Sequence, residues 1–180
     1  MVRVDRRRIR PPLHVVGAGY RANVESIRFA TVDAGSDGAR WAMSQYFAEL
    51  DERFPRGFDP GDALAEAVAL MNPPNGVFLV AVRGDDVVGC GGVQYLDDTT
   101  AEIKRMWVGP DARGAGLGKR LLARLEELAR VSGRTRVVLD TNGVLLPAIA
   151  MYRSSGYIDI DRYNDNPYAE HWFAKDLRSS

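Results

Sequence analysis

Residues 101–118 read AEIKRMWVGPDARGAGLG, and this stretch joins a strand, a glycine-rich loop and a helix. The alternating pattern over 100–108 predicts the strand, and a glycine-proline pair ends it. Leucines at helical spacing over 117–131 predict an amphipathic helix directly after the loop. Successive glycines let backbone N–H groups turn inward, and the positive end of the helix dipole lies behind them. We therefore expect the glycine loop, residues 113–118, to bind an anion such as a pyrophosphate.

The segments on either side of this stretch show further strand and helix patterns. Their order, β-α-α-β-β-β-α-β-α-β-β, places a meander of strands before one crossover helix, which is typical of a layered α+β domain. The expected strands are 24–32, 77–82, 87–95, 100–108, 136–141, 157–161 and 172–175, and the expected helices are 36–54, 62–71, 117–131 and 147–154.

The composition fits one globular domain. The chain has 180 residues, 46% of them hydrophobic, and it balances 24 basic residues against 24 acidic ones. This length predicts a single domain, and zero net charge argues against a nucleic-acid protein that relies on bulk electrostatics. Five arginines in residues 1–12 predict a solvated basic arm. We expect that arm to precede a domain over 13–180.

The cysteine and histidine counts narrow the classes further. A single cysteine, Cys90, cannot form an internal disulfide, and its apolar strand predicts a buried, inert thiol. With only two histidines and no zinc-type spacing, we expect no metal site. No apolar run approaches the roughly 20 residues of a membrane-spanning helix, and no apolar stretch of a secretory signal follows the N-terminal charges. We therefore expect a cytoplasmic protein without a membrane partner.

Two other glycine patterns fit nucleotide-binding motifs poorly. Residues 17–22 have the spacing of a dinucleotide fingerprint, but a strand-like stretch follows where that fingerprint needs a helix. The pair Gly118-Lys119 is followed by Arg120, where a phosphate-binding P-loop needs Ser or Thr. The glycine loop is therefore the anion site that the sequence favours.

Two blocks of the chain resemble the GNAT family of N-acetyltransferases. Residues 101–118 look like the family's pyrophosphate motif, Arg/Gln-x-x-Gly-x-Gly/Ala, and AIAMYRSSGY (148–157) is similar to its second conserved block. The resemblance covers about residues 24–177. It implies a single GNAT-like domain, with a mixed twisted sheet of about six to seven strands and helices on both faces. It also implies acetyl-CoA as the donor and an amine of a small molecule or peptide as the acceptor.

The resemblance assigns the cofactor contacts to two parts of the chain. Backbone groups of the strand 101–108, splayed from the strand 136–141, would pair with the pantetheine arm, and the glycine loop would hold the pyrophosphate. Leu145 stands where the family often has Asn, and Asn142 is a substitute for that contact. The implied cofactor-binding residues are Met106, Trp107, Val108, Arg113, Gly114, Ala115, Gly116, Leu117, Gly118, Lys119 and Asn142.

The catalytic candidates are one tyrosine and two carboxylates. Tyr152 matches the family tyrosine that lies beside the sulfur, which implies a general acid for the leaving thiolate. Glu102 resembles the glutamate base of histone-type members, and Asp140 lies where ribosomal-protein-type members carry a glutamate. We favour Glu102 because its longer side chain reaches further, with Asp140 or a water chain as the alternative. The Val108 N–H would stabilise the oxyanion.

The acceptor is left open by the sequence. The stretch 163–172 reads as a loop of the kind that carries specificity in the family, so Asn164, Tyr168, Glu170 and His171 are candidates for the acceptor site. A CoA-binding regulatory module without turnover and a transferase using a different acyl-CoA are the alternative functions. A homodimer is compatible with each of them.

Overall fold

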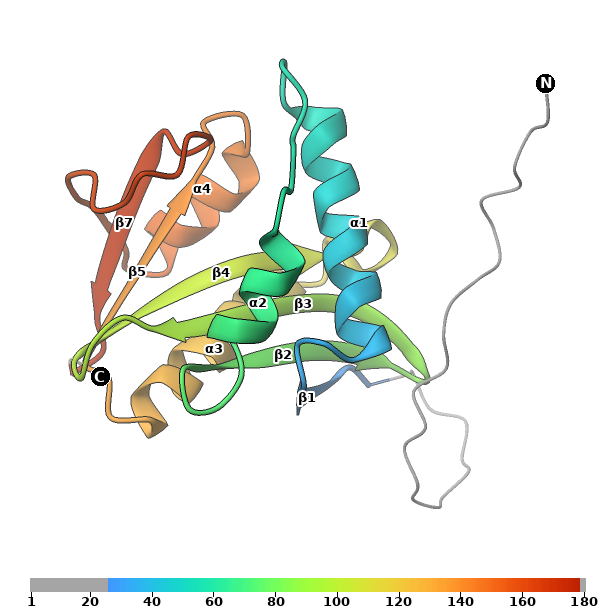
Figure 1. Ribbon diagram of the computed structural model, residues 1–180, viewed down its shortest axis with the longest axis horizontal. Helices are drawn as coiled ribbons and strands as arrows, with labels where there is room; N and C mark the ends of the chain where they lie inside the picture. The colour runs from blue at the N-terminus through green and yellow to red at the C-terminus, as the bar shows by residue number, and fades with distance from the viewer. Residues whose placement is uncertain (1–25, 179–180) are drawn as a thin grey trace.

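The computed structural model describes residues 26–178, which form a mixed seven-stranded sheet with helices on both faces (Figure 1). The basic arm 1–12, the glycine pattern 17–22 and the start of the domain expected from residue 13 lie outside the described residues. The strands are β1 (Arg28–Val32), β2 (Gly76–Arg83), β3 (Asp86–Tyr95), β4 (Thr100–Val108), β5 (Arg136–Thr141), β6 (Ile158–Asp159) and β7 (His171–Asp176). The helices are α1 (Asp37–Arg53), α2 (Ala63–Leu70), α3 (Leu117–Val131) and α4 (Leu146–Ser154), with a 3₁₀ turn at Pro110–Ala112.

The order of elements confirms the sequence prediction, and the bounds differ mainly at the sheet edges. Of the strand expected over 24–32, residues 28–32 form β1, whose Arg28 pairs with Val82 near the end of β2, while residues 24 and 25 lie outside the described residues. The strand expected over 157–161 shortens to the two residues of β6, which pair only with Ala174 and Phe173 of β7. A strand at the edge of a sheet has a hydrogen-bonded neighbour on one side only, so it extends only as far as it pairs with that neighbour.

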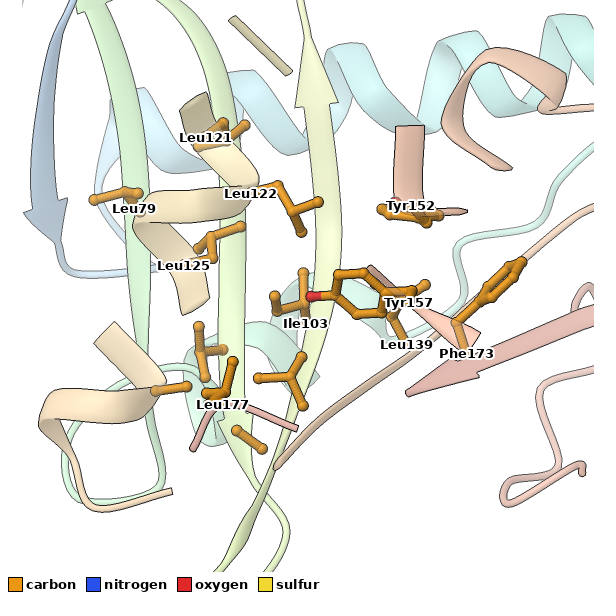
Figure 2. Close-up of a cluster of buried hydrophobic side chains, with 14 of the residues drawn as sticks. Leu79, Ile103, Leu121, Leu122, Leu125, Leu139, Tyr152, Tyr157, Phe173 and Leu177 are labelled. Carbon is orange, nitrogen blue, oxygen red and sulfur yellow. The ribbon is translucent and has the colours of Figure 1, made fainter. Parts of the chain in front are cut away.

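Each face of the sheet is covered by its own pair of helices. On one face α1 and α2 bury Met43, Phe47 and Met71 against Phe78 and Trp107. On the other face the α3 leucines point toward Ile103 of β4, while Tyr152, Tyr157 and Phe173 fill the half nearer β5 and β7 (Figure 2). The sheet therefore separates two apolar cores, and both contribute hydrophobic stabilisation.

Adjacent glycines of β3 let helices approach both faces closely. A Cβ at Gly91 would lie 2.6 Å from Leu125 Cδ1, and one at Gly92 would lie 2.2 Å from Met71 Sδ. Successive side chains of a strand point to opposite faces, so the first glycine admits α3 and the second admits the end of α2.

The strands β4 and β5 form the only parallel pair in the described sheet, and they separate along their length. They pair only at Thr100↔Arg136, Ala101↔Val137 and Glu102↔Val138, after which β4 runs on to Val108 and β5 to Thr141 without meeting. Figure 1 shows the two strands diverging from a common end. The sheet thus contains a wedge, as the family resemblance implied.

A β-bulge interrupts β4 inside the wedge. The register to β3 shifts between Cys90 and Gly92, and Arg105 has φ 57°, which is rare for a residue with a Cβ. Regular alternation along the expected strand 100–108 predicts that Glu102 shares a face with Lys104, Met106 and Val108. That prediction is wrong, because Met106 and Val108 pack with the α3 core, on the face opposite Lys104.

Candidate active site

Two cavities meet inside the wedge. The first, which we call the loop cavity, has a volume of about 460 Å³ and extends along β4 to the glycine loop. The second, the polar cavity, has a volume of about 520 Å³ and lies between β4, β5, the segment joining α1 to α2, and the segment before β7. Both are lined by Tyr46, Leu50, Met106, Leu145, Ala148 and Tyr152. A group at this junction is accessible from both sides.

The glycine loop has the geometry of an anion site. Gly114 and Gly116 have φ 87° and 73°, and a Cβ on either would meet no atom within 4 Å. The Arg120 N–H donates to the Gly116 carbonyl at 3.2 Å, so the N–H groups of the three preceding residues come before the first intrahelical bond of α3. These donors and the helix dipole favour a phosphate at this end of the loop cavity.

Most of the predicted cofactor residues line the loop cavity. Ala115 is exposed and lines neither cavity, and Asn142 lines the polar cavity instead. The Asn142 side chain donates to the Tyr168 carbonyl at 2.7 Å and accepts the Val144 N–H at 3.0 Å, so it holds the neighbouring loop. The predicted residues that line the loop cavity are Met106, Trp107, Val108, Arg113, Gly114, Gly116, Leu117, Gly118 and Lys119.

Glu49 of α1 organises the wall of the loop cavity, and the sequence analysis did not single it out. Its Oε1 pairs with Arg53 at 2.7 Å, and its Oε2 accepts the Trp107 indole N–H at 2.9 Å and also pairs with Arg113. Arg113 Nε donates to the Val108 carbonyl at 2.9 Å. These contacts hold the Arg113 side chain against β4 and α1.

Tyr152 of α4 lies at the junction of the cavities, as a general acid requires. It is buried at 7% exposure, and burial, followed by the charges of Tyr46 and Asp140, raises the pKa of its phenol. Tyr46 of α1 lines the same junction, and burial raises its pKa to about 12. Both phenols are thus protonated at neutral pH and available as donors. Tyr46 falls within the helix expected over 36–54, and the sequence analysis did not single it out.

Glu102 is enclosed by its own partners. It is 4% exposed and lines neither cavity. Its Oε1 accepts the Tyr163 hydroxyl at 2.8 Å and the Asn164 amide at 3.2 Å, and its Oε2 lies 3.4 Å from Lys104 Nζ. This carboxylate anchors the segment before β7 and the side chain of Lys104.

Asp140 occupies the more accessible position. It lines the polar cavity and accepts hydrogen bonds from the amides of Asn164 at 2.5 Å and Asn166 at 2.8 Å. Asn164 also bonds Glu102, so one amide joins the two carboxylates that the sequence analysis proposed as bases. Of the two, the geometry favours Asp140 for contact with an acceptor.

The segment before β7 supplies part of the polar cavity. Asn164 and Tyr168 line it, together with Asn166, which the sequence analysis missed although it belongs to the same Asn-rich stretch. Glu170 and His171 do not line it. Glu170 accepts the Gly143 N–H at 2.8 Å, and His171 begins β7 and stacks on Phe173.

An aromatic wall closes the polar cavity across from β5. The Tyr168 ring lies 4.8 Å from Phe58 and 5.8 Å from Phe54, measured between ring centroids, and all three residues line the cavity. The Tyr168 hydroxyl accepts the Asp59 N–H at 3.0 Å. Segments more than 100 residues apart in the chain thus meet over the cavity.

Three further observations concern the chain outside the cavities. Cys90 is fully buried and burial raises the pKa of its thiol, so the expected buried cysteine is confirmed. Within residues 26–178, no three His, Cys, Asp or Glu side chains are grouped to hold a metal ion. The helices of that same region include none with the length and apolar character to cross a membrane.

The sheet splits between two parallel strands, with the glycine loop at the end of one cavity and the polar cavity beside it, which is the arrangement that the resemblance to N-acetyltransferases implied. Residues 39–157 match the Acetyltransferase (GNAT) family, which is two thirds of the chain. The chain belongs to this family.

Relatives and solved structures agree with this assignment. An IAA acetyltransferase from Azospirillum brasilense is 42% identical over 121 residues, covering 66% of this chain and 78% of that protein. An acetyltransferase of the GNAT family from Staphylococcus aureus has a TM-score of 0.74 at 16% identity, over 85% of this chain and all of the other. An acetyltransferase from Salmonella typhimurium, solved with its cofactor acetyl-CoA, has a TM-score of 0.61 at 21% identity, over 86% of this chain and 96% of the other. The two structural likenesses show the shared fold.

Proposed function

We propose that the protein transfers an acetyl group from acetyl-CoA to the amine of a small molecule or peptide. The observation that carries this proposal is the meeting of the two cavities at Met106 and Tyr152. A thioester that enters along the loop cavity and an amine that enters through the polar cavity would come into contact there. The names of the relatives favour acetyl over other acyl groups as the donor.

The loop cavity is suited to CoA along its whole length. The glycine loop offers backbone N–H groups and open space to the pyrophosphate. The edge of β4 beyond Glu102 is not paired with β5, so its backbone is available to the amides of the pantetheine arm. Because the Val108 carbonyl already accepts a bond from Arg113, we propose that Arg113 moves when the arm binds.

The reaction needs a proton acceptor and a proton donor. An alkyl ammonium has a pKa near 10.4, so less than about 0.1% is neutral at pH 7. We assign the proton acceptor to Asp140, because it lines the polar cavity whereas Glu102 does not. The amine nitrogen attacks the thioester carbonyl, the carbon–sulfur bond breaks, and Tyr152 protonates the thiolate. The backbone N–H of Val108 is our candidate for stabilising the oxyanion.

An acceptor screen tests this function. The purified chain is incubated with acetyl-CoA and one amine at a time, chosen from amino acids, polyamines, aminoglycosides and short peptides. The release of free thiol is followed, and the masses of the products are measured by mass spectrometry. We expect amine-dependent thiol release together with an acetylated product. Tight acetyl-CoA binding without release for any amine would indicate a binding module and contradict the proposal. Faster turnover with propionyl-CoA would correct the donor.

A further inference from the structure

Two successive basic side chains of β4, Lys104 and Arg105, line the polar cavity. Ile103 and Met106 line it as well, so four consecutive residues of β4 face the cavity along the edge that β5 leaves unpaired. The bulge lies within this run, and Arg105 adopts φ 57° there, an unfavourable conformation for a residue with a Cβ. Strain of this kind persists where it positions a side chain for a task.

These two cations have hydrogen-bonding capacity left over. Arg105 Nη2 pairs with Glu66 at 2.7 Å, but Arg105 Nε is buried and has no hydrogen-bond partner among the described residues. Lys104 Nζ lies 3.4 Å from Glu102 Oε2, which is longer than an ordinary N–H···O bond. A buried donor without a partner is unfavourable, so a ligand oxygen that reaches the pair would be stabilised.

The other wall of the polar cavity carries the opposite charge. Asp140 of β5 lines it, and within residues 26–178 no Lys or Arg forms an ion pair with Asp140. Its two hydrogen-bonded partners, Asn164 and Asn166, are neutral amides. A ligand with a positive group at Asp140 and a negative group at the β4 pair would complement both walls.

We propose that the acceptor is an amino acid with an apolar side chain, its amine at Asp140 and its carboxylate at Lys104 and Arg105. This inference rests on the proposed acetyl transfer and names its substrate class. The aromatic wall of Phe54, Phe58 and Tyr168 provides an apolar surface for the amino-acid side chain. Asp59, Asp62 and Glu66 also line the cavity, and Glu66 is paired with Arg105. The two aspartates would repel any carboxylate, so we expect only one that Lys104 and Arg105 hold, and no second carboxylate on the ligand.

The test compares amino acids with their own carboxamides. L-phenylalanine and L-leucine are assayed against L-phenylalaninamide and L-leucinamide, with 1,4-diaminobutane as the dication. We expect kcat/KM to favour each acid over its amide, and Lys104→Met to reduce that preference about tenfold or more, the effect of losing a hydrogen bond to a charged group. Because the same pair of amines is compared in every variant, the difference in their basicity cancels.

Two more variants guard against loss of folding. Arg105→Gly removes the guanidinium while glycine accepts the positive φ of the bulge, so it should reduce the preference in a folded protein. Arg124→Gln, on the exposed face of α3, removes a charge outside both cavities and should leave the preference unchanged.

The outcomes separate the two proposals. Turnover that favours the amides or 1,4-diaminobutane, or an acid preference that survives both Lys104→Met and Arg105→Gly, would overturn the substrate class and leave acetyl transfer standing. If no amine is turned over, the proposed function fails, and calorimetry of L-phenylalanine and its amide with the CoA-bound protein decides the substrate class. Tighter binding of the acid would support that class, and equal binding or none would overturn it.

Discussion

Replacing Gly116 with alanine should separate the stability of the glycine loop from its ability to bind a ligand. Gly116 has φ 73° and a Cβ there would meet no atom within 4 Å, so the cost in the free protein is confined to the backbone. A residue with a Cβ in this conformation costs roughly 1–2 kcal/mol. For a domain of this size that lowers Tm by about 2 to 8 °C.

A matched control exists at the other end of α3. Gly133 has φ 90° and is equally open, but it does not line the loop cavity. Gly133→Ala should therefore lower Tm by a similar amount and leave acetyl-CoA affinity unchanged. Gly116→Ala places a methyl group where phosphate must approach backbone N–H groups, and losing one such charged hydrogen bond weakens binding about 10- to 100-fold.

The assay is calorimetric titration of acetyl-CoA into wild type and both variants, with Tm recorded on the same samples. Equal affinity in a folded Gly116→Ala protein would refute the assignment of the pyrophosphate to this loop. Equal loss of affinity in both variants would show that backbone strain, rather than contact with the ligand, is responsible.

Three further predictions follow from the junction and its carboxylates. Tyr152→Phe should lower kcat about 10-fold or more with unchanged acetyl-CoA affinity, and an unchanged kcat in steady-state assays would move the acid role to water. Asp140→Asn should lower kcat/KM about 100-fold at pH 7, and its kcat/KM should recover in part toward pH 10 as the amine loses its proton unaided. Glu102→Gln should show a smaller loss of kcat/KM without this recovery. A pH–rate profile that reverses this order would restore Glu102 as the base. The fold raises the pKa of Tyr46 from 10.0 to about 12, so the stabilisation that its neutral phenol contributes is complete below pH 10 and is lost as pH rises through 12. The unfolding free energy of wild type should therefore fall over this range, and Tyr46→Phe should reduce the fall by about 2–3 kcal/mol. Identical pH profiles of the two proteins in denaturant titrations would argue against this.

Local patterns were sufficient to predict the order of elements and the glycine loop. The helix over 117–131 and the strand over 136–141 have the predicted bounds, because periodicity and flanking turn residues act within a few positions of each other. Tyr152 was singled out by the resemblance of residues 148–157 to the family's second block, and it lies in α4.

The bulge at Arg105 could not be predicted from local patterns. No glycine marks the position, and the extra residue is defined by the register against β3 rather than by its neighbours in the chain. The bulge moves Met106 away from the face of Lys104, so the face that regular alternation predicts for Met106 and Val108 is wrong.

The relation between the two carboxylates was also hidden in the sequence. Side-chain length favoured Glu102, but the burial of Glu102 depends on Tyr163 and Asn164, which lie about 60 residues later in the chain. The same long-range packing brings Glu49 to Trp107 and Arg113. Contacts of this kind follow from tertiary structure, and single-sequence periodicity carries no information about them.

A crystal structure of the chain with acetyl-CoA is the most direct test of the central claim. We predict that the pyrophosphate lies on residues 113–118, that the pantetheine arm runs along β4 between the diverging strands, and that the thioester lies at the junction beside Tyr152. Pyrophosphate density away from the glycine loop, or a thioester more than one side chain away from Tyr152, would contradict the account.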